Sequence, residues 1–231
     1  MTTILHKLKV ASRIARKRLF SFAGKWNEKL QPAENFCIKQ GYHHSKKVEQ
    51  FDDTIFTDEW QREVYLKAAD LIRKNSFRSV IDVGCGSAYK LVHILGEFDT
   101  TGIEIEPTYS WLQKKYPQRK WLLFDNTNPS EMNGHVVICS DVIEHISNPD
   151  QLMKFLASIN FQKLIITTPE RDLVAGKKDF GPPRNTAHYR EWNADEFRNY
   201  VSIWFYVEQQ IILNDKSITQ MLICNKLSLQ S

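Results

Sequence analysis

Short apolar runs alternate with helix-like segments between residues 79 and 169, and this alternation constrains the fold more than any other feature of the chain. The apolar runs, which we interpret as strands, cover 79–84, 100–106, 120–125, 134–141 and 163–169. Segments with a helical pattern, at 88–96, 107–115 and 148–158, separate most of them. Strands joined through helices pair in parallel, so the sequence predicts a doubly wound α/β sheet that is mostly parallel.

Further elements flank this alternating region. Asn193 and Glu196 have capping-box spacing for a helix through about Val201, and strands at 203–212 and 218–225 follow, which brings the predicted sheet to seven strands. On the other side, Asp58 is placed to cap a helix through about Lys74. Its expected buried face comprises Trp60, Val64, Ala68 and Leu71.

The remaining sequence divides into three expected parts. Residues 1–30 form a basic helical extension, residues 31–58 a polar linker and covering loop, and residues 59–231 the main domain. No apolar run approaches the roughly 18 residues of a membrane span. Four widely spaced cysteines without a C-x-x-C pair argue against zinc and disulfides, so we expect no metal site and a cytoplasmic, reducing location.

Positive charge is concentrated at the start of the chain. The whole sequence has 31 Lys and Arg against 27 Asp and Glu, but residues 1–27 hold seven of the basic residues and none of the acidic ones. The body is therefore slightly acidic, which argues against a nucleic-acid partner. The basic segment has one apolar helical face, which suits a helix packed on the body or on a second subunit of a homodimer, a peripheral membrane helix, or a targeting peptide.

The first strand runs into the sequence VIDVGCGSA, in which Gly84 and Gly86 lie two residues apart. In a doubly wound sheet this turn is where a ligand binds, because glycines let the backbone approach it closely. Glu104 lies 20 residues beyond Gly84, at the end of the second strand, where an acid can hold ribose hydroxyls. A dinucleotide fingerprint would need glycine at position 89; Tyr89 there disfavours NAD and FAD.

Four stretches in order resemble the motifs of class I S-adenosylmethionine-dependent methyltransferases, which have a Rossmann-like fold. They are VIDVGCGSA, TGIEIEP, the Asp125 that follows the third strand, and VVICSDVIEHISNP, and together they cover about residues 78–170. Ala88 departs from the pattern, since most of the family has glycine there, and we expect this single methyl to be a mild change. The resemblance implies S-adenosyl-L-methionine as the cofactor.

The resemblance also assigns the cofactor contacts. It implies that Asp82, Gly84 and Gly86 line the methionine part, that Glu104 binds the ribose with Glu106 as a rival, and that Asp125 and Asn126 meet the adenine. Each carboxylate has a plainer alternative as a turn cap or a solvated strand end. The full expected set is Asp82, Gly84, Cys85, Gly86, Glu104, Ile105, Asp125, Asn126, Ser140 and Asp141.

The segment after the fourth strand bears on the acceptor. It reads CSDVIEH and lacks the [DNS]-P-P-[YF] motif of many exocyclic-amine methyltransferases. It resembles the same segment in small-molecule O-methyltransferases of ubiquinone biosynthesis and in enzymes of polysaccharide gene clusters. The resemblance places Asp141 and His145 above the cofactor, and His145 is our preferred base because an ordinary histidine titrates near neutrality. Its alternative is a histidine hydrogen-bonded at a helix start, without chemistry.

A second stretch that bears on the methyl acceptor is residues 169–192, which include the sequence GPPRNTAHYREW. This stretch resembles a segment of methyltransferases encoded among glycosyltransferases. The expected acceptor contacts are Arg184, His188, Tyr189, Arg190 and Trp192. A sugar could stack on Trp192 and an acidic group could pair with Arg190, while His188 is the second candidate for the base. The alternative for Trp192 is a place in the core, since tryptophans are mostly buried.

The function that the sequence favours is O-methylation of a saccharide, such as a surface polysaccharide or a lipid-linked glycan precursor, or of another small molecule. A lipid-linked acceptor would explain a basic leader at an anionic membrane. Two alternatives stay open. One is a methyltransferase that acts on a quinone, a natural product or a protein, and the other is a catalytically silent subunit that binds the cofactor.

Overall fold

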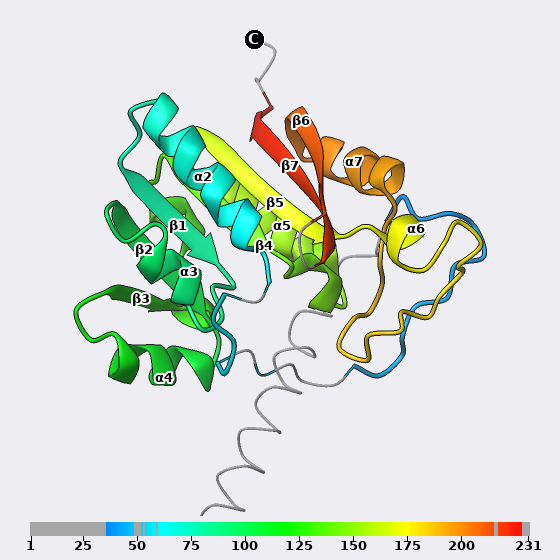
Figure 1. The fold of residues 1–231 in the computed structure, drawn as a ribbon, viewed down its shortest axis with the longest axis horizontal. Coiled ribbons are helices and arrows are strands. Elements are labelled where there is room, and N and C mark those ends of the chain that lie inside the picture. The colour runs from blue at the N-terminus through cyan, green and yellow to red at the C-terminus, as the bar shows by residue number, and fades with distance from the viewer. Residues whose placement is uncertain (1–35, 49–51, 53, 59, 215–216, 228–231) are drawn as a thin grey trace, which may run out of the picture.

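A seven-stranded sheet forms the centre of the protein (Figure 1). The computed structural model describes residues 36–48, 52, 54–58, 60–214 and 217–227, so the predicted basic extension lies outside the described residues. The strands are β1 Ser79–Val83, β2 Asp99–Glu104, β3 Lys120–Leu123, β4 Val136–Ser140, β5 Lys163–Pro169, β6 Phe205–Asn214 and β7 Ile218–Lys226. The predicted fold class is confirmed.

The order of the strands across the sheet is β3-β2-β1-β4-β5-β7-β6. Strands β1 to β5 are parallel, and β7 pairs antiparallel with both β5 and β6. The order reverses between β1 and β4, which is the switch point where doubly wound sheets bind ligands. The carboxyl ends of the five parallel strands therefore share one edge of the sheet.

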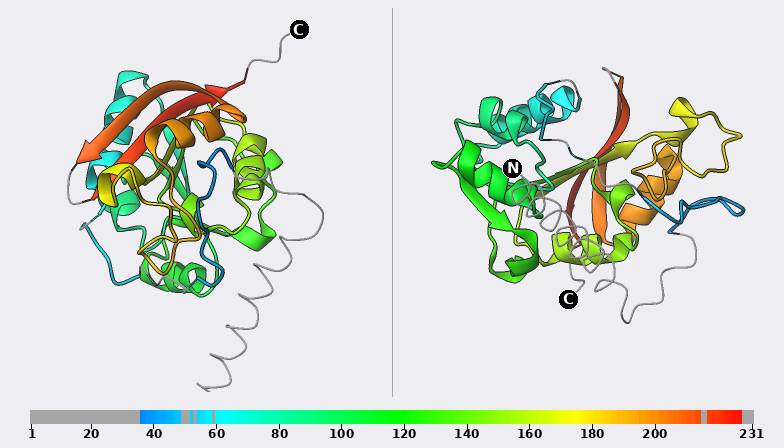
Figure 2. Two further views of the ribbon diagram at one scale, coloured as in Figure 1. Left: turned by 90° about the vertical axis from the view of Figure 1, so that its right-hand side faces the viewer. Right: turned by 90° about the horizontal axis from the view of Figure 1, so that it is seen from below.

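Helices cover both faces of the sheet (Figure 2). They are α2 Arg62–Lys74, α3 Tyr89–His93, α4 Thr108–Lys115, α5 Pro149–Ser158, α6 Arg171–Val174 and α7 Ala194–Ser202, with the 3₁₀ turns η1 Phe124–Asn126, η2 Pro129–Glu131 and η3 Ile143–His145. Successive strand residues point to opposite faces. Val80 packs with α2, α3 and α4 on one face, whereas Ile81 packs with α5 and α7 on the other.

The start of α2 differs from the prediction. The helix begins at Arg62, after Gln61 in a left-handed conformation, so Asp58 does not cap it and instead forms an ion pair with Arg62. Trp60 precedes the helix and is exposed, and Leu71 is only partly buried. The buried face comprises Val64, Tyr65, Ala68, Ala69 and Ile72. The predicted capping box at Asn193 and Glu196 is confirmed.

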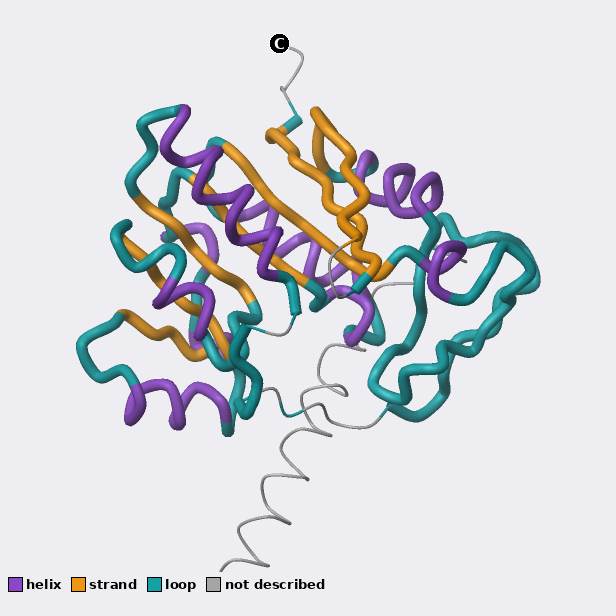
Figure 3. Tube along the Cα trace, viewed as in Figure 1, coloured by secondary structure: helices purple, strands orange, loops and turns teal. Residues whose placement is uncertain are grey.

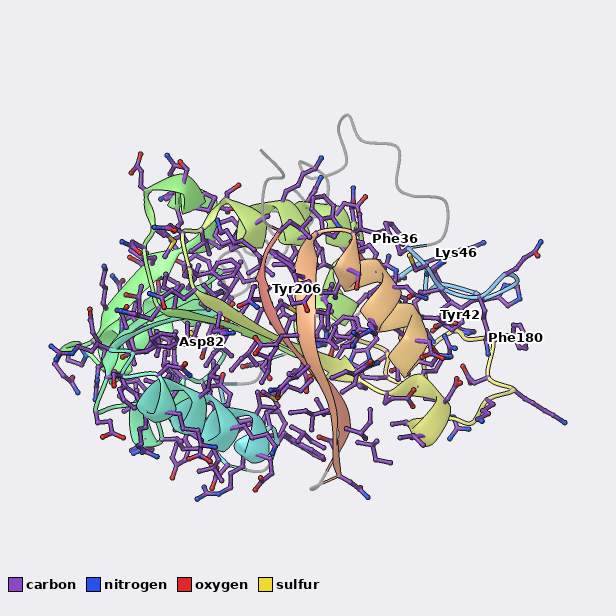
Figure 4. The ribbon with its side chains drawn as sticks, turned by 90° about the horizontal axis from the view of Figure 1, so that it is seen from above. Phe36, Tyr42, Lys46, Asp82, Phe180 and Tyr206 are labelled. Carbon is purple, nitrogen blue, oxygen red and sulfur yellow. The ribbon has the colours of Figure 1, made fainter. Side chains whose placement is uncertain are left out.

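Residues 36–48 lie along the long loop between α6 and α7 (Figures 2 and 3). The amide of His43 donates to the carbonyl of Phe180 at 2.8 Å, and that of Ser45 donates to the carbonyl of Tyr189 at 2.9 Å. Figure 4 shows Phe36 and Tyr42 on the same side of the molecule as Phe180. Because Phe36 and Tyr42 are buried, this part of the predicted linker is a component of the core as well as a cover.

Candidate active site

The turn after β1 has the backbone shape expected of a ligand-binding loop. Gly84 and Gly86 have φ angles of 74° and 54°. A Cβ on Gly84 would lie 2.5 Å from a methyl of Val142, so only glycine fits there. Ala88 also has a left-handed φ, of 52°, which costs an L-residue about 1–2 kcal/mol. Alanine at this position therefore carries a backbone cost that glycine would not, which the sequence pattern alone does not show.

Glu104 links the end of β2 to this turn. Its carboxylate accepts hydrogen bonds from the amides of Gly86 and Ile105, each at 2.9 Å. Glu106 is exposed and accepts instead from the hydroxyl of Ser110 at 2.8 Å. Of the two acids considered for the ribose, Glu104 is the one that faces the glycine turn.

The other expected cofactor residues lie around the same edge. Asp82 is fully buried, and one of its oxygens accepts from the hydroxyl of Tyr65 at 2.8 Å. Burial and Asp82 raise the pKa of Tyr65 well above its usual value, so Tyr65 stays a neutral donor. Cys85 is buried, whereas Asp125 and Asn126 are exposed in η1. Tyr65 was not among the cofactor residues predicted from the sequence.

Asp141 is held at the end of β4 by two neighbouring elements. Its carboxylate accepts from the Thr167 hydroxyl at 2.6 Å and from the Gln61 side chain at 3.0 Å. The buried Ser140 hydroxyl lies 3.0 Å from the same Thr167 hydroxyl. Burial raises the pKa of Asp141 although both hydrogen bonds oppose the shift. Gln61, which directly precedes α2, and Thr167, which lies in β5, were not predicted from the sequence.

His145 and His188, 43 positions apart in the chain, meet edge to face with ring centroids 4.7 Å apart. Nδ1 of His145 donates to the carbonyl of Ala187 at 2.8 Å, and Nδ1 of His188 lies 2.6 Å from a carboxylate oxygen of Glu191. Burial, aided by His188, lowers the pKa of His145 to about 4. The reason for preferring His145 as the base, an ordinary pKa near neutrality, therefore does not hold.

Glu144 lies beside this histidine pair and is fully buried in the middle of η3, the 3₁₀ turn that ends at His145. One carboxylate oxygen accepts from the Thr168 hydroxyl at 3.0 Å. Burial, followed by the charge of Asp141, raises the pKa of Glu144 well above its usual range. Glu144 was not among the residues predicted from the sequence, although it directly precedes His145.

A cavity of about 500 Å³ opens next to the histidine pair. Its wall combines polar and apolar side chains, namely Arg184, Asn185, His188, Glu191, Leu173 and Val174. Arg184 is exposed, and His188 is buried except where it reaches the wall. The cavity has room and polar groups for a small acceptor.

Two of the residues expected to contact the acceptor are instead buried and hydrogen-bonded within the protein. Trp192 is fully buried and donates to the carbonyl of Phe36 at 2.9 Å, so it cannot stack on a sugar. Arg190 is buried and donates to the carbonyls of Ile146 and Ser147 at 2.7 and 2.6 Å, which leaves it no room to pair with an acceptor. The alternative, that this segment anchors the following helix in the core, is correct for Trp192.

Comparison with known proteins identifies the fold. A family model described as "Methyltransferase domain" matches residues 57–212. The methyltransferase domain of bacterial CtHen1-C is 19% identical, with a TM-score of 0.58, over 72% of this chain and 98% of that one. Magnesium protoporphyrin IX methyltransferase from Synechocystis PCC 6803, with bound SAH, is 16% identical, with a TM-score of 0.56, over 72% and 84%.

The plantazolicin methyltransferase BpumL, in complex with SAH, is 13% identical, with a TM-score of 0.55, and the match covers 74% of this chain and 86% of that one. A comparison with curated proteins found no match. At these identities the solved structures show the fold alone, and the family model carries the assignment.

The sheet order, the glycine turn and the acid at the end of β2 define a Rossmann-like enzyme with a nucleotide-type cofactor. The chain belongs to the methyltransferase-domain family and is an S-adenosylmethionine-dependent methyltransferase. None of the helices in the described residues is long and apolar enough to cross a membrane.

Proposed function

We propose that the enzyme transfers a methyl group from S-adenosylmethionine to a hydroxyl group of a saccharide or another small molecule. The observation that carries the proposal is the histidine pair beside the cavity, in which Glu191 orients His188. A hydroxyl holds its proton too tightly at neutral pH to attack unaided, so it needs a neighbouring group that takes the proton. The resemblance of residues 181–192 to enzymes of polysaccharide clusters favours a saccharide.

His188 fits the role of proton acceptor better than His145 does. It lines the cavity, and its Nδ1 donates to the Glu191 carboxylate, which fixes the orientation and the tautomer of the ring. His145 is turned toward the carbonyl of Ala187, and its lowered pKa makes it a weak base. In this arrangement Arg184 and Asn185 would contact the acceptor at the cavity wall.

The test is methyl transfer by the full-length enzyme with isotope-labelled S-adenosylmethionine. Candidate acceptors are free sugars, nucleotide sugars and a lipid-linked glycan extract, with quinone precursors and peptides as the alternative classes. A glycan that gains the mass of one methyl in place of one hydrogen supports the proposal. Transfer only to a quinone or a peptide would overturn the acceptor class, and cofactor binding without any transfer would favour a silent subunit.

For the cofactor, Glu104 is our proposed ribose ligand. Glu104→Ala should weaken binding of S-adenosylhomocysteine by about 1–3 kcal/mol, roughly 5- to 150-fold, because a charged acceptor for two hydroxyls is lost. Calorimetry measures the affinity, and Glu104→Gln checks that an altered turn is not the cause. Glu106→Ala is the matched control, and a larger effect there would move the ribose role to Glu106.

The role of the basic residues 1–27 remains a prediction. They form either a helix packed on the body or on a second subunit, or a helix that contacts an anionic membrane. Seven positive charges, at up to about 1 kcal/mol each near such a surface, would dominate membrane binding. Deletion of residues 1–27 should then abolish sedimentation with anionic vesicles and leave cofactor binding intact. Unfolding or dissociation of a dimer on deletion would instead favour the packed helix.

A further inference from the structure

Glu144, His145 and His188 bring three metal-ligating groups together. One ligand atom from each residue lies within 4.8 Å of the other two. Two of the residues belong to η3 after β4, and the third comes from the loop before α7, so the fold assembles the group from distant parts of the chain. A cation about 2.0–2.2 Å from each ligand would draw these atoms closer together by small side-chain rotations.

The carboxylate of Glu144 has one oxygen without a hydrogen-bond partner in the described part of the chain. Its other oxygen is bonded to Thr168, and the residue is fully buried. A buried polar atom left unpaired is costly, and an ion at the site is one of its standard explanations.

Both histidines are arranged as metal ligands usually are. Nδ1 of His145 faces the Ala187 carbonyl and Nδ1 of His188 faces the Glu191 carboxylate, so in each neutral ring the proton lies on Nδ1 and the lone pair on Nε2. Such an outer oxygen partner typically fixes the tautomer and orientation of a metal-binding histidine. Nε2 of His188 lies 3.0 Å from the Asn185 amide nitrogen, a donor that a cation would replace.

We propose that Glu144, His145 and His188 bind one divalent transition-metal ion, such as Mn²⁺ or Zn²⁺. Two imidazoles and one carboxylate suit such ions, and three protein ligands leave positions open for solvent or a substrate oxygen. The expectation of no metal site rested on cysteine spacing and did not weigh a histidine–carboxylate set. This role rests on the proposed function. A hydroxyl bound to the cation would be more acidic, so its proton would pass to solvent while its oxygen takes the methyl group from S-adenosylmethionine, which leaves as S-adenosylhomocysteine. His188 would then act as a ligand instead of the base.

The experiment uses the untagged full-length chain, stripped of metal and titrated with Mn²⁺, Zn²⁺ and Co²⁺. We expect one Mn²⁺ per chain by electron paramagnetic resonance and visible Co²⁺ bands that report nitrogen ligands. Glu144→Gln and His188→Gln should each weaken binding by at least about tenfold. Glu144→Gln keeps the shape of the side chain, and circular dichroism checks that each variant is folded.

His43→Gln removes an exposed histidine outside the cluster and should bind metal as the unaltered protein does. The proposal would be overturned if the unaltered chain bound none of the three ions stoichiometrically. It would also be overturned if Glu144→Gln and His188→Gln bound metal as tightly as the unaltered chain does. S-adenosylhomocysteine titrated into the same metal-free sample tests the proposed function separately. If cofactor binding and methyl transfer both persist in the presence of a chelator, the reaction does not need a metal ion, and His188 remains the proposed base.

Discussion

Replacement of His188 by glutamine should lower turnover by about 10²- to 10⁴-fold and leave the affinity for S-adenosylmethionine unchanged. The loss follows whether His188 removes the hydroxyl proton itself or holds a cation that acidifies the hydroxyl, since either contribution has this size. Cofactor affinity should persist because the expected cofactor contacts lie at the ends of strands β1 to β4, whereas His188 lies in the loop before α7 and lines the acceptor cavity.

The measurement for His188→Gln is single-turnover methyl transfer with the true acceptor, with calorimetry for the cofactor. Glu191→Gln should give a smaller loss, because it leaves His188 in place and removes only the carboxylate that orients it. His43→Gln serves as the matched histidine control. Normal turnover of His188→Gln would contradict the role of the histidine pair in this account.

Replacement of Arg171 by glutamine should lower the free energy of unfolding by about 3–5 kcal/mol. Arg171 is fully buried, and its guanidinium donates to both carboxylate oxygens of Glu196, at 2.6 and 3.0 Å, and to Asp172 at 3.1 Å. Glutamine would leave the buried Glu196 carboxylate without its cation. Glu196 also closes the capping box of α7, so the start of this helix should loosen first.

Urea unfolding measures this loss. The matched control is Arg73→Gln, which breaks an exposed ion pair with Glu97 and should cost less than about 1 kcal/mol. Arg171 also donates to the carbonyl of Glu191, the residue that orients His188, so Arg171→Gln should reduce turnover as well. Equal unfolding free energies for Arg171→Gln and the unaltered protein would show that the buried pair contributes nothing net.

Periodicity and glycine placement were enough to predict the sheet, because both are local in sequence. The runs around Gly84, Glu104 and Asp141 each carry their own strand pattern, and the predicted class of fold followed from their order. Helix starts were harder: Asp58 looks like a cap, but α2 starts only at Arg62, after the left-handed Gln61. The side chain of Gln61 donates a hydrogen bond to Asp141, 80 residues away, and no local pattern marks such a contact.

The acceptor-binding residues were harder to predict than the sheet, because whether such a residue faces a ligand or the core depends on its burial in the folded protein. Trp192 and Arg190 have side chains typical of sugar and acid recognition, yet the fold uses them to anchor the loop against residues 36–48. Glu144 and His188 meet only because the loop before α7 returns to the end of β4. No periodic pattern in the sequence marks a contact between segments that far apart.

The most direct test of the account is a calorimetric titration of the full-length chain with S-adenosylhomocysteine and, separately, with NAD⁺. We expect saturable binding of S-adenosylhomocysteine at one site per chain, weakened in Glu104→Ala. We expect no binding of NAD⁺, because Tyr89 occupies the position where a dinucleotide site needs glycine. Tight binding of NAD⁺ with none of S-adenosylhomocysteine would contradict the account.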